Sequence, residues 1–180
     1  MKSFLIGLFL WIPTNLLAQV FETEFQVLLE AGPDYQSVRW ADFDNDSLPD
    51  VLVTASNVAG ETIFSFFRNT GTGFSAQPSI NSLLKDIAIE LTDLNGDNRI
   101  DIVATGVQGS EGATVSFVNK GAFIFQPTQI LPVAGSFLAF SDFDQDGRAE
   151  LLISGSDGAT PFLDIYRRSG DQWNLVNDSL

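Results

Sequence analysis

Short apolar runs bounded by turn residues recur three times along the chain, in the same order within each copy. In each copy one run precedes a polar loop and another follows it directly. The preceding runs cover residues 37–43, 86–91 and 137–143, and the following runs cover residues 51–53, 102–104 and 151–153. Apolar runs of this length, closed by Ser, Thr or Gly, are typical of strands buried on both faces. The pattern therefore predicts a strand on either side of each loop.

A third and a fourth strand are expected in each copy. The third strands are predicted at residues 62–68, 114–119 and 162–167, and each enters a turn that contains glycine, which favours a hairpin. The fourth strands are then expected to begin at Phe74, Phe123 and Trp173. Four short strands in a repeat of about fifty residues are typical of a β-propeller blade. The predicted fold class is all-β, a partial β-propeller of about three four-stranded blades; the alternative is a β-sandwich with Asp-rich turns.

The repeat also predicts how the chain is divided. Blades are expected over residues 33–83, 84–134 and 135–180, and residues 19–32 are expected to supply the outer strand of a preceding blade. Closed propellers have about four to eight blades. We therefore expect the chain to be a fragment of a larger propeller, or to need further blades or a partner chain to complete one.

The first residues predict a signal peptide over residues 1–18. Lys2 supplies a positive charge, residues 4–12 supply an apolar segment, and residues 16–18 fit a cleavage site. Pro13 interrupts the apolar run, which is too short to span a bilayer; the alternatives are an uncleaved anchor and a buried helix. The mature chain is expected to be secreted or at the cell surface, or to stay in the periplasm, after bacterial-type export.

Each copy carries the same acidic loop, which we name the first (residues 42–50), second (93–101) and third (142–150) acidic loop. Loop positions 1, 3, 5 and 9 carry side-chain oxygens, and eleven of these twelve positions are carboxylates. So many like charges are unfavourable without a cation, and hard oxygen donors suit Ca²⁺. With the backbone carbonyl of position 7 included, the predicted ligands of about three Ca²⁺ ions are Asp42, Asp44, Asp46, Leu48, Asp50, Asp93, Asn95, Asp97, Arg99, Asp101, Asp142, Asp144, Asp146, Arg148 and Glu150.

Other kinds of cation site fit the loops less well. An EF-hand needs a glutamate at position 12 and flanking helices, whereas position 12 here is Val53, Ala104 or Ile153 and strands are predicted on both sides. Mg²⁺ gives up its water too reluctantly for such a ligand set. The remaining alternative is a solvated acidic turn. Because Asn95 removes one carboxylate and Glu150 adds a methylene, the second or third site is expected to bind most weakly.

Composition excludes several classes of function. The chain has no Cys and no His, which removes Ser-His and Cys-His catalysis, ordinary zinc sites and disulfides. Its net charge is −14 and its few basic residues are scattered. Nucleic acid and anionic membranes are therefore poor partners, and no membrane span is expected once the signal peptide is removed.

Residues 41–54 and 67–74, which contain the first acidic loop and the Asn-Thr-Gly-Thr-Gly-Phe turn, resemble FG-GAP/VCBS-type repeats. The same repeat class builds the N-terminal propeller of integrin α-subunits. The resemblance implies that each repeat is a propeller blade, that its loop binds Ca²⁺, and that the protein is of a kind often exported by bacteria. The chain departs from the family pattern at Ser47 and Glu150 and in its small number of blades.

We therefore expect an exported, calcium-binding, non-catalytic module that binds extracellular protein or glycan, as in cell adhesion, with Ca²⁺ in a structural role. Residues 57–62, 108–114 and 156–161 are candidate contact loops, and plain hairpin connections are the alternative. The competing function is an accessory propeller in a secreted polysaccharide-degrading enzyme. No spacing unites the polar residues available for catalysis: Asp34, Tyr35, Asp86, Glu90, Asp164 and Tyr166.

Overall fold

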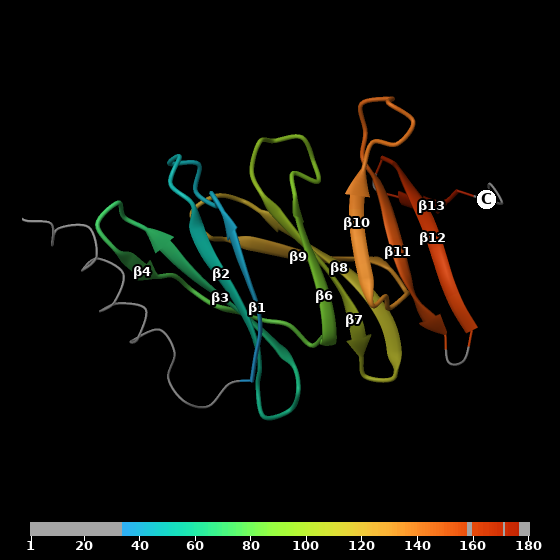
Figure 1. Ribbon diagram of the computed structural model, residues 1–180, viewed down its shortest axis with the longest axis horizontal. Coiled ribbons are helices and arrows are strands. Elements are labelled where there is room, and N and C mark those ends of the chain that lie inside the picture. Colours follow the sequence, from blue (N-terminus) through green and yellow to red (C-terminus); the bar gives the residue numbers. More distant parts are fainter. Residues whose placement is uncertain (1–33, 158–159, 171, 177–180) are drawn as a thin grey trace, which may run out of the picture. The chain divides into compact units, whose positions relative to one another are not determined.

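The computed structural model describes residues 34–157, 160–170 and 172–176, which form three antiparallel sheets (Figure 1). They belong to one compact unit, Gly32–Leu180. The all-β class and the pattern of about four strands per sheet are confirmed. The predicted signal peptide and the strand expected within residues 19–32 lie outside the described residues.

Apart from one short strand, Ile80–Asn81, which pairs with the third strand of its sheet, the strands of each sheet follow chain order, and the neighbouring strands are antiparallel. The first sheet contains β1 (Asp34–Ala41), β2 (Asp50–Ser56), β3 (Thr62–Asn69), β4 (Phe74–Ala76) and β5 (Ile80–Asn81). The second contains β6 (Lys85–Thr92), β7 (Asp101–Gln108), β8 (Glu111–Asn119) and β9 (Phe125–Leu131). The third contains β10 (Phe137–Ser141), β11 (Glu150–Asp157), β12 (Thr160–Ser169) and β13 (Gln172–Leu175).

Two details of the outer strands differ from the sequence-based prediction. The first sheet has a fifth strand, β5, which pairs with β3 beyond the point where β4 ends. Pro78 lies between β4 and β5 and has no N–H for the ladder, so the outer edge is divided into two short strands. Phe123 does not begin a strand: its backbone is left-handed (φ 59°), and β9 begins at Phe125.

The hydrophobic core explains why Phe123 leaves the strand. Its ring is buried and lies 6.3 Å from the ring of Phe43, in the loop between β1 and β2, and 6.0 Å from the ring of Phe66 on β3. Phe66 also stacks on Phe125 of β9 at 4.8 Å. One core cluster is therefore shared by the first two sheets. A second, smaller cluster joins Leu131 of β9 to side chains of the third sheet.

The second strands of the first two sheets are buried where they follow the acidic loop. Six of the seven residues of β2 and the first six of β7 are buried, with no alternation between faces. This is expected for a strand packed on both sides, and it agrees with the continuous apolar runs in the sequence. In β11 of the third sheet burial alternates instead, because Leu152 is exposed between buried Leu151 and Ile153, so the prediction of a strand buried on both faces is wrong there. Within the described residues, no helix is long and apolar enough to cross a membrane.

Candidate metal centres

The three acidic loops have the same backbone conformation. Each connects the first strand of a sheet to the second (Figure 1). Positions 4 and 6 have a positive φ between 60° and 86° in every loop. These residues are Asn45 and Ser47, Gly96 and Asn98, and Gln145 and Gly147. Two left-handed residues separated by a single residue turn the backbone sharply within each loop.

Hydrogen bonds hold this turn in the same way in each loop. The position-1 carboxylate accepts the backbone N–H groups of positions 5 and 6: in the first loop, Asp42 accepts from Asp46 at 3.1 Å and Ser47 at 2.7 Å. Asp93 and Asp142 accept the corresponding pairs at 2.7–3.1 Å. The position-5 carboxylate accepts the N–H of position 7 at 2.9–3.0 Å in all three loops. The acidic side chains therefore build the loop that presents them.

Two of the loops bring three carboxylates together. Oxygens of Asp42, Asp44 and Asp50 lie within 4.8 Å of one another, as do oxygens of Asp142, Asp144 and Asp146. Among the described residues, these are the groups of three or more acids that could hold a metal ion. The second loop is not among them; its position 3 is Asn95, and its Asp97 pairs with Arg99 at 2.5 Å. The carbonyls of Leu48, Arg99 and Arg148 remain predicted ligands.

One carboxylate oxygen of the first loop has no hydrogen-bond partner in the described part of the chain, although the other oxygen of the same group pairs with Arg68. The Oδ1 atom of Asp44 is buried and has no hydrogen-bond partner among the described residues. A buried carboxylate oxygen without a partner costs free energy. Because Asp44 belongs to one of the two acid triads, a cation bound beside this atom would remove that cost. The donor set, all hard oxygen, fits Ca²⁺.

The position-9 carboxylates have a second role that the sequence did not reveal. Asp101 is fully buried, and it accepts the N–H of Leu94 at 3.0 Å and the N–H of Asn119 at 2.7 Å. It therefore joins the start of the loop to the end of the third strand. Asp50 does the same with Phe43 and Asn69, at 2.9 and 2.8 Å.

Glu150, at position 9 of the third loop, links the start of its loop to the third strand of its sheet less firmly. Its carboxylate accepts the N–H of Phe143 at 3.4 Å, and its other oxygen meets the Nε atom of Arg167 at 3.1 Å in place of a backbone N–H. The extra methylene of Glu displaces the carboxylate from the position that Asp50 and Asp101 occupy. The third loop is accordingly the least firmly attached to its sheet at position 9.

Burial raises the pKa of Asp50 and of Asp101, although two backbone hydrogen bonds to each carboxylate lower it. Like charges on the neighbouring loop acids raise the pKa further. A divalent cation beside either carboxylate would favour its ionised form. The electrostatics of the loops therefore agree with a bound cation.

An arginine reaches each loop. Arg68 of β3 pairs with Asp44 at 2.5 Å and with Asp46 at 2.9 Å. Arg167 of β12 pairs with Asp144 and Glu150. Strand register places Arg68, Val118 and Arg167 at equivalent positions. In the second sheet, where this position is Val118, Arg99 of the loop itself supplies the guanidinium group.

Hydrogen bonds between consecutive repeats also recur at one position. Asn119, at the end of β8, donates its Nδ2 hydrogen to the carbonyl of Phe43 at 2.8 Å. Arg168 occupies the equivalent position on β12 and donates from Nη1 to the carbonyl of Leu94 at 2.7 Å. Phe43 and Leu94 are both position 2 of their loops. Sequence reasoning missed this contact because an amide and a guanidinium group perform it in different repeats.

The candidate catalytic residues are spread over all three sheets. Asp34 and Tyr35 lie on β1, Asp86 and Glu90 lie on β6, and Asp164 lies on β12. Tyr166 donates to Asp164 at 3.3 Å on the same strand. Among the described residues, the acidic side chains that lie together in groups of three belong to the first and third acidic loops and not to these catalytic candidates.

Comparison with known families agrees with the loops and sheets. Residues 93–153 match an FG-GAP-like repeat. This segment runs from the start of the second acidic loop into β11, the strand that follows the third acidic loop. No curated protein matches the chain.

FG-GAP repeats form propeller blades, and the matched segment lies in the second and third of the three antiparallel sheets. The FG-GAP-like segment contains all of β7, β8, β9 and β10, so it spans the change from one sheet to the next. FG-GAP repeats are typically non-catalytic. The family resemblance stated from the sequence is therefore confirmed for residues 93–153.

Proposed function

We propose that the protein is an exported, calcium-stabilised, non-catalytic repeat module that binds extracellular protein or glycan. The observation that carries the calcium assignment is the buried Oδ1 atom of Asp44, which has no hydrogen-bond partner among the described residues and belongs to a residue of an acid triad. The FG-GAP-like match supports a binding module over an enzyme. The signal-peptide pattern of residues 1–18 supports export, where Ca²⁺ is plentiful.

The three sites are proposed to differ in affinity. The first and third loops have three carboxylates each within 4.8 Å. The second loop has Asn95 in place of a carboxylate, and Arg99 pairs with Asp97. A third ion would bind there most weakly, because fewer negative charges face it.

Removal of calcium is expected to lower the melting temperature. With a dissociation constant of about 0.1 mM and about 1 mM Ca²⁺, each site contributes about 1.4 kcal/mol. Two occupied triads give about 3 kcal/mol, which corresponds to a shift of roughly 6–12 °C in a chain of this size. The shift is measured by thermal unfolding in Ca²⁺ and in EDTA. The double variant Asp44→Asn, Asp144→Asn should lose most of it, and identical melts of the original chain in both conditions would reject the calcium assignment.

Replacing Arg68 with glutamine is expected to raise the Ca²⁺ affinity of the first loop about five- to tenfold. The guanidinium group competes with the ion for Asp44 and Asp46, and any positive charge that stays near the site repels the ion. Calorimetric titration with Ca²⁺ measures the change. Arg39→Gln is the matched control, since Arg39 lies on β1 and its guanidinium donates to the carbonyl of Val38. An unchanged or weaker affinity in the Arg68 variant would contradict the competition.

A further inference from the structure

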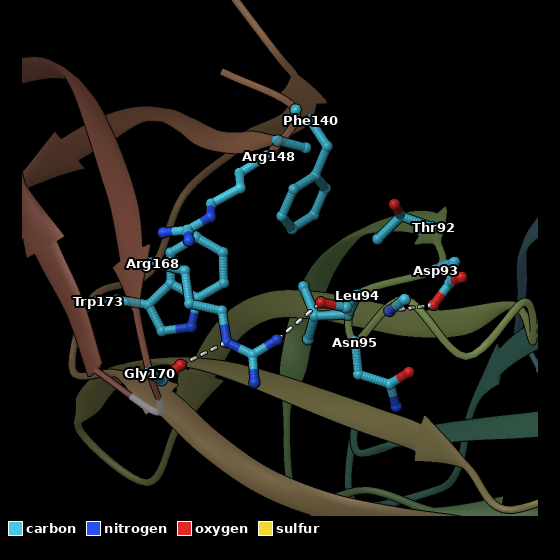
Figure 2. A pocket seen from close by; sticks show the side chains of 12 residues that line it. Thr92, Asp93, Leu94, Asn95, Phe140, Arg148, Arg168, Gly170 and Trp173 are labelled. Carbon is cyan, nitrogen blue, oxygen red and sulfur yellow. Dashed lines mark hydrogen bonds between the residues drawn. The ribbon is translucent and has the colours of Figure 1, made fainter. Parts of the chain in front are cut away.

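A cavity of about 400 Å³ lies between the second and third acidic loops. Figure 2 shows Trp173, Arg148 and Phe140 along one wall, and Asp93 and Asn95 on the opposite side. This volume is within the range of small-molecule sites, which are concave and combine aromatic surface with a few polar groups. None of the residues that line it belongs to the candidate contact loops expected from the sequence.

The aromatic wall is held in place by the fold. Trp173 of β13 pairs with Arg168 of β12 in the sheet register, and its ring meets that of Phe140 edge to face at 6.1 Å. Both rings pack on the second core cluster and are only half-buried. The exposed part of the indole is therefore a fixed apolar surface at the edge of a polar cavity. A pyranose, whose chair presents one face of C–H groups, matches such an apolar surface.

The cavity is lined by two guanidinium groups, those of Arg148 and Arg168, and by the carboxylate of Asp93. The two guanidinium groups have different environments. Arg168 is fixed by hydrogen bonds from Nε to the carbonyl of Gly170 at 2.9 Å and from Nη1 to the carbonyl of Leu94 at 2.7 Å (Figure 2). Arg148 is exposed, and no carboxylate of the described residues pairs with its guanidinium group. In this it differs from Arg68, Arg99 and Arg167, each of which pairs with a loop acid. A guanidinium group in this setting suits a carboxylate ligand, which it can bind with two parallel hydrogen bonds.

We propose that this cavity binds a uronic acid residue of an extracellular polysaccharide. The sugar ring packs on Trp173, its carboxylate pairs with Arg148, and the exposed amide of Asn95 meets a ring hydroxyl from the opposite side. The inference rests on the proposed function, because nearby carboxylates repel an anion until Ca²⁺ neutralises them. Asp93 of the second acidic loop lines the cavity, and Asp142, Asp144 and Asp146 lie in the same loop as Arg148.

The test is calorimetric titration of the full chain with tri-galacturonate in millimolar Ca²⁺. Galactotriose is the neutral sugar control, acetate is the simple anion control, and tri-glutamate represents an acidic peptide. Tri-galacturonate is expected to bind, with the other three at least tenfold weaker. Arg148→Gln should weaken tri-galacturonate binding about tenfold or more, since a charge-assisted pair is lost. Arg39→Gln, which makes the same charge change outside the cavity, should leave the affinity within twofold.

Because Trp173 packs on the core, its ring is tested with Trp173→Phe, which keeps an aromatic side chain and should weaken binding several-fold without loss of folding. Equal binding of galactotriose, of acetate or of tri-glutamate would overturn the assignment to a uronic acid. If Arg148→Gln left the affinity for tri-galacturonate unchanged, this cavity would be rejected as the binding site. If Ca²⁺ still raises the melting temperature while tri-galacturonate does not bind, the uronic acid site is rejected and the calcium module stands. If Ca²⁺ has no effect on the melting temperature, the proposed calcium-stabilised module is rejected, and the uronic acid site that rests on it is rejected as well.

Discussion

Replacing Asp101 with alanine is expected to lower the free energy of unfolding by about 2–6 kcal/mol, even when no calcium is present. The substitution leaves two backbone N–H groups without their acceptor: that of Asn119, which is buried, and that of Leu94, which is partly buried. Each buried donor that loses its partner costs about 1–3 kcal/mol. The Ala side chain also leaves space where a fully buried carboxylate had been.

Urea unfolding in EDTA measures this loss apart from any contribution of a bound ion. Asp101→Asn is the matched variant, because it keeps the shape and one acceptor oxygen; an intermediate loss is expected. Glu150→Ala is the comparison at the same loop position and should cost clearly less, since Glu150 accepts only one backbone N–H, at 3.4 Å. If Asp101→Ala in EDTA were as stable as the original chain, position 9 would be a metal ligand with no part in the fold.

The repeat and its sheets could be predicted because their signals are local. Apolar runs, turn residues and acidic spacing are all read within a few residues, and strand order follows when each strand pairs with the next. The outer strands were less predictable. Phe123 looked like the start of a strand, but burial of its ring against Phe43 and Phe66 from the preceding sheet determined its backbone. Such a preference depends on residues more than fifty positions away.

The candidate sites show the same limit. Acidic residues at positions 1, 3, 5 and 9 indicated a cation, and the structure does bring two triads together. The arginine that reaches each loop was not foreseen, because Arg68 and Arg167 come from the third strand of their sheets. Their approach depends on strand register. The spacing of the loops also gave no sign that the second and third enclose a cavity with Trp173.

Replacing Phe43 with alanine is expected to lower the free energy of unfolding by about 3–5 kcal/mol, the range for a fully buried aromatic residue. Phe43 is position 2 of the first acidic loop, yet its ring lies edge to face with Phe66 at 5.4 Å and with Phe125 at 6.1 Å. It therefore connects the first sheet to the second. Loss of the ring would open a cavity in the shared core cluster, and the loop backbone would keep its hydrogen bonds to Asp50 and Asn119.

The repeat supplies its own control for this substitution. Phe143 is the same loop position in the third copy, but its side chain is 53% exposed, and its recorded ring contact is the guanidinium group of Arg167 at 5.9 Å. Phe143→Ala should change the free energy of unfolding by less than about 1 kcal/mol, as expected for a surface site. Both variants are compared by urea unfolding in Ca²⁺. Equal losses of unfolding free energy for the two variants would contradict a core shared by the first two sheets. The loss would then depend on the position in the acidic loop and not on burial of the ring. A large loss for Phe43 alone would show that one loop position serves packing in one repeat and lies at the surface in another.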